Sequence, residues 1–309
     1  MRRQSSSLWH LPLILIGITM LLPLAFMFVT ALAEPGHSMS AASSFVDFIV
    51  PRAWRWDNFA AVGRVIPFAR FYINSLLVSG LTTVGVVFTS ACAAYAFSRL
   101  EWRGRDAVFT AYLATMMVPA AVTMLPNFIA MKILPDLLAQ VLPWIDWQAQ
   151  RVLGVTVQDP AVGRLAGIDS YFALIVPVMF SAYGTFMLRQ FFLSIPRDID
   201  EAAEIDGAGH WMIFSRIILP LALPALATLT VFSFLGTWGS FIWPLIVTNR
   251  TELGTLPLGL LAFQNTGNYG TDWPLMMAAA LLILLPIVIL FLLGQRFFVA
   301  GARTGAIKG

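Results

Sequence analysis

Five carboxylates gathered between residues 198 and 206 are the densest set of chemically capable side chains in this chain: Asp198, Asp200, Glu201, Glu204 and Asp206. Clustered carboxylates can bind a metal ion or transfer protons, but both tasks require further ligands or a partner base. The nearest histidine, His210, is interpreted as a surface residue, and no other His or Cys lies close in sequence. The acids therefore predict neither a catalytic site nor a metal site. A one-signed cluster is instead suited to contact with a basic partner.

The composition places these acids in a membrane protein. Hydrophobic residues make up 59% of the 309 residues, charged residues only 11%, and the mean hydropathy is +0.80. Soluble proteins carry about 25% charged residues. The only cysteine, Cys92, excludes a disulfide framework. No basic cluster with interleaved aromatics is present, so the basic pI near 9.3 indicates charge at a lipid surface and no nucleic-acid partner.

Six uncharged runs reach the roughly 20 residues needed to cross a hydrocarbon core of about 30 Å. They lie near residues 11–33, 73–98, 107–128, 171–188, 217–247 and 275–295. Lipid leaves no water to satisfy open strand edges. We therefore predict an all-α polytopic membrane protein whose six spans form a single domain over residues 1–309. The fifth run is longer than one span, and Pro220, Pro224 and Pro244 are expected to bend its ends.

The distribution of Lys and Arg predicts the orientation. With six spans, the two termini and the loops near 99–106 and 189–216 share one side, which carries 11 of the 19 basic residues. We therefore predict a bacterial plasma-membrane protein with both termini and the acidic loop in the cytoplasm. Residues 31–33 (Ala-Leu-Ala) imitate a signal-peptide cleavage site, but the apolar stretch before them exceeds the usual length of about 7–15 residues. The first run is expected to stay as a span.

The inventory of charges constrains the source of energy. All 35 charged residues and the three histidines fall outside the six spans, whereas proton- or ion-coupled transporters place ionisable groups at membrane depth. Lys132 and Lys308 follow Met131 and Ile307, so the chain has no Gly-Lys-Ser/Thr phosphate loop. If this protein performs active transport, its energy must come from another polypeptide. We expect the energy from that polypeptide to be transmitted to this chain through the acidic loop.

The segment from about 194 to 220 is predicted to form two short helices joined by a turn. Ser194 and Pro196 suit the start of the first helix, and its early acids complement the helix dipole. Gly207 and Gly209 are expected to take positive φ and to turn the chain. A narrow face of the first helix is open to close approach by a partner: Ile199, Ala202 and Ala203. On these grounds alone, an amphipathic connector lying on the membrane surface remains an alternative.

The spacing of residues 201–220 resembles the EAA motif of bacterial ABC importer permeases. It reads Glu201-Ala202-Ala203, three residues, Gly207, nine residues, Ile217, one residue, Leu219-Pro220. The surrounding EAAEIDGA, IILPLALPALAT and FSFLGTWGSFIWPLI and the ending QRFFVAGARTGAIKG are similar to the carbohydrate-uptake branch, of the type of the maltose permease subunit MalG. The resemblance runs from about residue 70 to the C-terminus. It implies the type I ABC importer permease fold.

The resemblance also implies partners and a division of labour. The chain itself would catalyse nothing, and ATP and Mg would be bound by a partner. The implied partners are two copies of a cytoplasmic ABC ATPase, a second permease subunit and an extracytoplasmic solute-binding protein, besides membrane lipid. The solute would be a sugar, an oligosaccharide or a glycerol-phosphate-like compound.

Residue roles follow from the same resemblance. Glu201 would pair with a basic residue of the ATPase, Ala202 and Ala203 would enter its cleft, and Gly207 would form the bend. The other implied contacts are Ile217, Leu219 and Pro220 in the coupling loop, Gly305, Lys308 and Gly309 at the ATPase interface, and Gln264, Asn265, Asn268 and Tyr269 toward the binding protein.

Some features remain open at this point. Trp238-Gly239-Ser240 stands where the family usually has Trp-Asn, which weakens a sugar contact there, and the predicted loop over residues 129–170 has no functional interpretation. One alternative function is a permease for a non-sugar polar solute. The other is an integral-membrane transferase, which would need His or metal ligands beside the acids.

Overall fold

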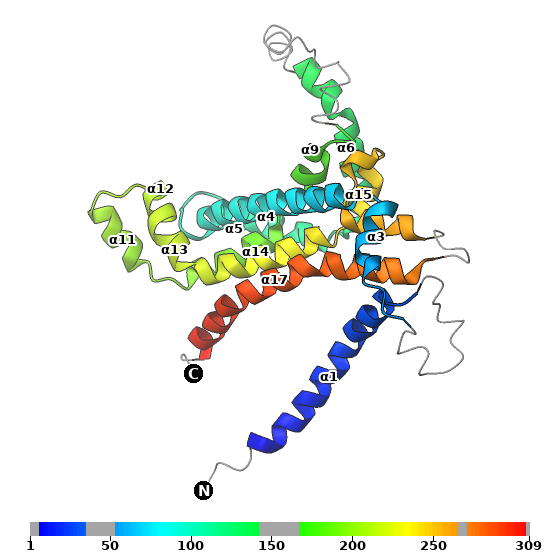
Figure 1. Ribbon diagram of the computed structural model, residues 1–309. Helices are drawn as coiled ribbons and strands as arrows, with labels where there is room; N and C mark the ends of the chain where they lie inside the picture. Colours follow the sequence, from blue (N-terminus) through cyan, green and yellow to red (C-terminus); the bar gives the residue numbers. More distant parts are fainter. Residues whose placement is uncertain (1–5, 35–52, 142–166, 265–270, 307–309) are drawn as a thin grey trace. The chain divides into compact units, whose positions relative to one another are not determined.

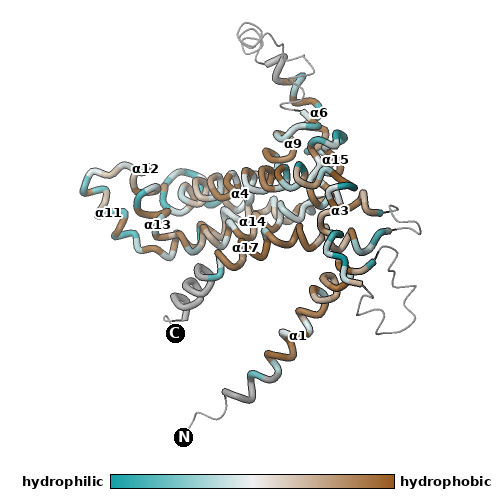
Figure 2. Tube along the Cα trace, viewed as in Figure 1, coloured by the Kyte–Doolittle hydropathy of each residue, from teal (hydrophilic) through white to brown (hydrophobic). Residues whose placement is uncertain are grey.

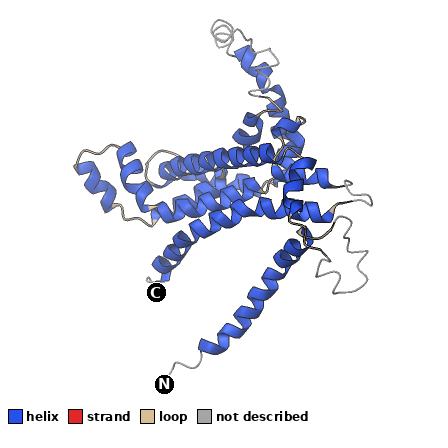
Figure 3. Ribbon diagram, viewed as in Figure 1, coloured by secondary structure: helices blue, strands red, loops and turns tan. Residues whose placement is uncertain are grey.

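The computed structural model describes residues 6–34, 53–141, 167–264 and 271–306, and every regular element in these ranges is a helix (Figure 3). This confirms the predicted all-α fold. The chain divides into two compact units. Unit 1 consists of residues 1–72 and 256–288, and unit 2 consists of residues 73–255 and 289–309.

Four described helices are long and apolar enough to cross a membrane. They are Pro12–Ala31 within α1 (Ser6–Ala31), α4 (Phe68–Ser98), Ala120–Leu137 within α6 (Ala120–Val141) and Trp273–Gln295 within α17 (Trp273–Ala306). Hydrophobic residues follow the length of α1, α4 and α17 in Figure 2. Two bent helix pairs raise the number to six if each pair counts as one span.

The third span differs from the predicted 107–128. Helix α5 (Arg105–Ala114) and the 3-10 turn η1 (Thr115–Met117) end before Val118, which has extended backbone angles. Val118 precedes Pro119, and a residue before proline is pushed out of the helical region. Helix α6 then starts at Ala120 and continues to Val141, so the first part of the loop predicted from residue 129 is helical.

The fourth and fifth spans are broken helices. Helix α9 (Tyr171–Ile175) and the 3-10 turn η2 (Val176–Val178) meet α10 (Ala182–Leu193) at 44°. The segment made of α12 (His210–Ile213), the π-helical turn η3 (Phe214–Ile218) and α13 (Leu219–Leu221) meets α14 (Leu223–Trp238) at 78°. That break lies between Pro220 and Pro224, as the prolines predict. Helix α15 (Ile242–Val247) follows after a second break.

Unit 1 ties the end of α1 to the short helix α3 (Asp57–Val65). The buried Asn58 side chain donates hydrogen bonds from Nδ2 to the carbonyls of Ala31 (2.9 Å) and Ala33 (2.8 Å). These bonds satisfy acceptors that the end of a helix leaves free. The Ala-Leu-Ala segment that imitates a cleavage site is fully buried in this contact. The unit also contains α16 (Leu256–Gly259) and the 3-10 turn η5 (Leu260–Phe263).

The core of unit 2 joins α4, α10 and α14 to the segment α12–α13 (Figure 1). Its fully buried large side chains are Leu188, Phe192, Ile213, Ile218 and Leu229. Between lipid-embedded helices, close packing supplies the attraction, and small residues permit the close approach. Gly184 of α10 does so here, because a Cβ at this position would lie 2.6 Å from Ser90 Oγ and 3.1 Å from Leu229 Cδ1.

We therefore expect Gly184→Leu to destabilise unit 2. The added side chain has no space between α4 and α14, and overpacking costs about 1–3 kcal/mol or more. Gly80→Leu is the matched control, because a Cβ at Gly80 meets nothing within 4 Å. Thermal unfolding of the purified protein in detergent measures both variants. Equal midpoints for the two would contradict the packing role of Gly184.

Candidate functional site

The acidic segment forms helix α11 (Asp198–Ile205), with Asp198, Asp200 and Glu201 in its first turn. Carboxylates there complement the positive end of the helix dipole, as predicted. The capping prediction was wrong. Ser194 ends α10, donating its hydroxyl to the carbonyl of Phe191 at 2.7 Å, and α11 begins after Arg197 without a side-chain cap.

One glycine turns the chain after α11. Gly207 has φ +84°, and the next amide, that of Ala208, donates to the carbonyl of Ala203 at 2.9 Å. A left-handed glycine with such a backward bond is a common helix ending. Gly209 has φ −77°, so the prediction of a positive φ there was wrong. The bend therefore depends on Gly207 alone.

A buried ion pair fastens α11 to the end of α4. Arg99 Nη1 lies 3.1 Å from Asp200 Oδ2, and the two side chains are only 4% and 13% exposed. Arg99 Nη2 also donates to the carbonyls of Phe192 (2.8 Å) and Ile195 (3.0 Å) at the end of α10. One guanidinium therefore holds three elements of unit 2 together: α4, α10 and α11.

The energetics of this pair favour a positioning role. Burial raises the pKa of Asp200 more than the nearby charge of Arg99 lowers it, so its pKa lies above the ordinary value. Arg99 Nε and Asp200 Oδ1 are also buried without a hydrogen-bond partner in the described chain. A buried pair of this kind adds little net stability, but loss of one partner strands the other charge. The pair therefore specifies where α11 sits.

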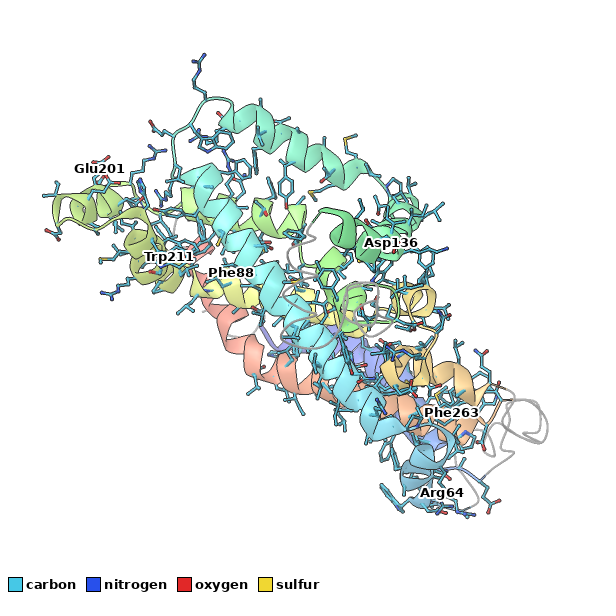
Figure 4. The ribbon with its side chains drawn as sticks, turned by 90° about the horizontal axis from the view of Figure 1, so that it is seen from above. Arg64, Phe88, Asp136, Glu201, Trp211 and Phe263 are labelled. Carbon is cyan, nitrogen blue, oxygen red and sulfur yellow. The ribbon has the colours of Figure 1, made fainter. Side chains whose placement is uncertain are left out.

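The outer surface of α11 is acidic and apolar at once. Glu201 and Ala202 are exposed, and Figure 4 places Glu201 on the helix that projects from the ends of α4 and α14. Ile205 is 86% exposed and Trp211, at the start of the next helix, 67%. Beside the ion pair is a cavity of about 600 Å³. Its charged and titratable lining comes from Tyr95, Arg99, Arg197, Asp200, Glu201, Glu204 and His210, among others.

Other residues of the motif face inward. Ala203 is half-buried against the core of unit 2, unlike Ala202. Ile217 and Leu219 pack on the same core, whereas Pro220 is exposed at the bend before α14. The motif thus combines an exposed acidic end with apolar residues that seat it.

The Arg99–Asp200 contact is one clasp, meaning a set of side-chain contacts that holds a loop beside one end of α4. A second clasp holds another loop of unit 2 at the other end of α4. Asn74 is buried and donates from Nδ2 to the carbonyls of Glu252 (2.8 Å) and Gly254 (2.9 Å), while its Oδ1 accepts from the Tyr171 hydroxyl (2.7 Å). Asp169, at φ 59°, accepts through Oδ1 from the amides of Asn249 and Arg250. Residues 249–254 are therefore held by side chains from α4 and from the start of the α9 segment.

Burial raises the pKa of Asp169, but the hydrogen bonds from Asn249 and Arg250 together outweigh it, and the pKa is lowered. At pH values above the ordinary pKa of an Asp side chain, the ionised Asp169 carboxylate therefore contributes its full stabilisation to the folded state. This contribution is lost as the pH falls through the lowered pKa of the folded state.

The residues predicted to contact the binding protein and the ATPase interface lie outside the acidic loop. Gln264 is exposed after η5 in unit 1, and Gly305 lies in the last turns of α17. Asn265, Asn268, Tyr269, Lys308 and Gly309 fall outside the described residues. Within the described ranges, no group of three or more His, Cys, Asp or Glu could hold a metal ion.

Sequence reasoning missed Arg99, Asn74 and Asp169. Arg99 carried a usable signal, since it is the first charge after a long uncharged run, and the predicted topology puts it on the same side of the membrane as the acidic loop. Asn74 and Asp169 carried none, because their partners are backbone groups distant in sequence.

Comparisons with known proteins place this geometry in a family. The model of the binding-protein-dependent transport system inner membrane component matches residues 85–304. The arabinooligosaccharides transport system permease protein AraQ of Bacillus subtilis (strain 168) is 31% identical over 263 residues, covering 84% of this chain and 82% of the relative. The sn-glycerol-3-phosphate transport system permease protein UgpE of Yersinia pestis bv. Antiqua (strain Antiqua) is 31% identical over 306 residues, covering 97% and 96%.

A solved structure shares the fold. It is a bacterial ABC transporter involved in the import of the acidic polysaccharide alginate, and the match has a TM-score of 0.72 at 21% identity. It covers 96% of this chain and 99% of that chain. The predicted permease fold is therefore confirmed.

We expect Asp200→Ala to lower the free energy of unfolding by about 3–5 kcal/mol, because it leaves the Arg99 charge buried and unpaired. The control is Glu101→Ala, which breaks the exposed pair with Arg197 (side chains 78% and 51% exposed) and costs about 0–1 kcal/mol. Chemical unfolding in detergent measures both. Replacing Arg99 and Asp200 together by Leu should recover only part of the loss, because no charge is stranded but the carbonyls of Phe192 and Ile195 lose their donor. Equal losses for Asp200→Ala and Glu101→Ala would contradict a buried positioning pair.

The clasp at Asp169 predicts a pH dependence. Asp169→Asn retains a residue that tolerates positive φ but removes the charge, so at neutral pH it should cost about 1 kcal/mol. Across a pH range from about 7 to about 2, wild-type stability should stay above that of the variant down to the ordinary Asp pKa of about 3.9 and should approach it only below that pH. Thermal unfolding across this range tests it. A constant difference at every pH would show that the carboxylate charge is not what holds the loop.

Proposed function

Because the chain belongs to the family of binding-protein-dependent transport system inner membrane components, we propose that residues 194–220 couple it to a separate ATPase. The chain is an ABC importer permease, a membrane component of a transporter and not an enzyme. ATP hydrolysis belongs to a partner, which would bind ATP and Mg.

The observation that carries the coupling role is the attachment of α11. Its exposed Glu201 and Ile205 suit a partner with a basic residue beside an apolar cleft, and Trp211 enlarges the apolar surface. The buried Arg99–Asp200 pair makes the helix continuous with α4 and α10. A partner that grips α11 therefore moves membrane helices rather than a loose loop. In this role Glu201 makes the contact, Ala202 enters the cleft, and Ala203, Ile217, Leu219 and Pro220 seat the loop, with Gly207 at its bend.

The partners follow from the family. The chain would act as one permease domain beside a second permease subunit, above two ATPase copies, and would receive solute from an extracytoplasmic binding protein. Both termini would be cytoplasmic, with Gly305, Lys308 and Gly309 reaching the ATPase interface. Gln264, Asn265, Asn268 and Tyr269 would face the binding protein.

The names of the relatives support a carbohydrate or related polyol derivative as the solute, since they transport arabinooligosaccharides and sn-glycerol-3-phosphate. A non-sugar polar solute is the alternative.

Reconstitution tests the proposal. The complete set of subunits is placed in proteoliposomes, and ATP hydrolysis and solute uptake are measured with and without the binding protein. Uptake should require ATP, the ATPase and the binding protein together. Turnover of a substrate by the isolated chain, or uptake without the ATPase, would overturn the proposal.

Glu201→Ala should lower uptake about tenfold or more, because truncating a buried charge contact at an interface costs roughly 2–5 kcal/mol. Insertion and thermal stability should remain those of the wild type, since Glu201 is exposed in this chain. Asp198→Ala is the matched control, an exposed acid one turn earlier on the same helix, and should retain most uptake. Equal uptake by both variants would remove Glu201 from the contact.

A further inference from the structure

Unit 2 contains a cavity that the coupling loop does not use. Its volume is about 340 Å³, within the roughly 300–1,000 Å³ typical of ligand sites. It lies among α4, the α9–α10 break, α14 and α15. Its polar and aromatic lining includes Phe180, Ser181, Ser233, Thr237, Ser240 and Trp243.

Both helix breaks on either side of this cavity open into it. Phe180 and Ser181 belong to the break between η2 and α10, and Ser240 belongs to the break between α14 and α15. Irregular backbone at membrane depth persists only where protein buries it or where it lines a polar cavity. Transporters commonly bind their solutes at such interrupted helices. Two interruptions that converge on one cavity therefore indicate a passage site.

The hydroxyl groups of the cavity have unused hydrogen-bonding capacity. Among the described residues, neither the Ser233 nor the Ser240 hydroxyl has a hydrogen-bond partner. Thr237 Oγ1 donates to the carbonyl of Ser233 (2.8 Å), which leaves its lone pairs free to accept. Ser181 Oγ accepts from the Gly184 amide (3.0 Å) and retains its own proton to donate.

Aromatic surfaces complete the lining. Phe180 is 68% exposed, and the Trp243 ring is oriented by a hydrogen bond from Nε1 to the carbonyl of Ala173 (2.9 Å). A few polar groups set among aromatic and aliphatic walls are the usual design of a small-molecule site. Gly239 stands where the family usually has Asn, so no side-chain amide is present at this position. The hydroxyl of the next residue, Ser240, and the other hydroxyls of the lining make the cavity polar instead.

No residue lining this cavity is ionisable. A phosphate or carboxylate entering it would lose its hydration without gaining Arg or Lys, at a large cost in free energy. An uncharged sugar offers hydroxyls to the serines and threonine and apolar ring faces to the aromatics. The lining thus discriminates by charge.

We propose that this cavity contacts the solute during transport and that the solute is an uncharged, hydroxyl-rich carbohydrate. The inference rests on the proposed function and narrows its solute class. It assigns a direct contact with solute to this subunit, at residues remote from the coupling loop.

Gly236 permits a direct test. It lines the cavity, and a Cβ built on it meets nothing within 4 Å. Gly236→Leu therefore adds a side chain at the cavity wall whose Cβ meets no protein atom, and the exchange favours the helix by up to about 1 kcal/mol. Gly17→Leu in α1 is the matched control, because Gly17 is exposed and also meets nothing within 4 Å.

The experiment uses the complete transporter in proteoliposomes with four labelled probes: arabinotriose and maltotriose, which are neutral, and sn-glycerol 3-phosphate and an alginate trisaccharide, which are anionic. We expect ATP-dependent uptake of a neutral probe. Gly236→Leu should lower that uptake about tenfold while binding-protein-stimulated ATP hydrolysis stays within about twofold of the wild type, and Gly17→Leu should leave both within about twofold.

The outcomes separate the two hypotheses. Uptake of only anionic probes would overturn the assigned solute class and leave the permease function intact. Unchanged uptake by Gly236→Leu would remove the cavity from the solute path. Absence of ATP-dependent uptake of all four probes, with ATP hydrolysis still stimulated by the binding protein, would overturn the assigned solute class and leave the permease function intact. Absence of that stimulation as well would contradict the proposed function, and this inference with it.

Discussion

The buried contact between Arg99 and Asp200 determines how the acidic loop relates to the rest of unit 2. Without it, α11 is a short exposed helix whose packing consists of Ala203 and a few neighbours. The ion pair is costly to bury, and burial keeps the pKa of Asp200 above its ordinary value. The cost is tolerable because the same guanidinium also satisfies two carbonyls at the end of α10. A contact with this balance specifies geometry rather than stability.

The membrane imposes the complementary constraint. Ionisable groups are expensive at membrane depth, so most of them lie outside the apolar runs. The helix Ala120–Leu137 departs from the sequence expectation, because it carries Lys132 and Asp136 toward its end. Between the helices of unit 2, the chain uses hydroxyls, helix breaks and aromatic rings. The proposed coupling site and the proposed solute site are thereby separated along unit 2. In the proposed mechanism, charge acts at the acidic loop, where the ATPase would bind. Neutral hydrogen bonding acts in the cavity between the breaks, where a hydrated ion would not be stable.

The sequence predicted elements whose causes are local. Uncharged runs gave the apolar helices, Pro220 and Pro224 gave the bend before α14, and Gly207 gave the turn after α11. Errors arose where two local signals competed. Pro119 divided the third span, and Ser194 capped the end of α10 instead of the start of α11. Asn74 and the cavity were beyond prediction because they join elements far apart in sequence, which only the packing brings together. Arg99 could have been singled out as the first charge after a long uncharged run, but its pairing with Asp200 could not.

Helix α4 connects the two clasps of unit 2. Asn74 holds the loop over residues 252–254 at one end, and Arg99 holds the acidic loop immediately after the other end. A continuous helix over that interval rises about 1.5 Å per residue, or about 37 Å in all, which approaches the thickness of a bilayer with its headgroups. Both contacts are buried and use several hydrogen bonds, so neither end can shift without breaking them. A displacement of the acidic loop by a partner is therefore delivered to the opposite loop through a single stiff element, and a load on that loop acts back on the acidic loop by the same route.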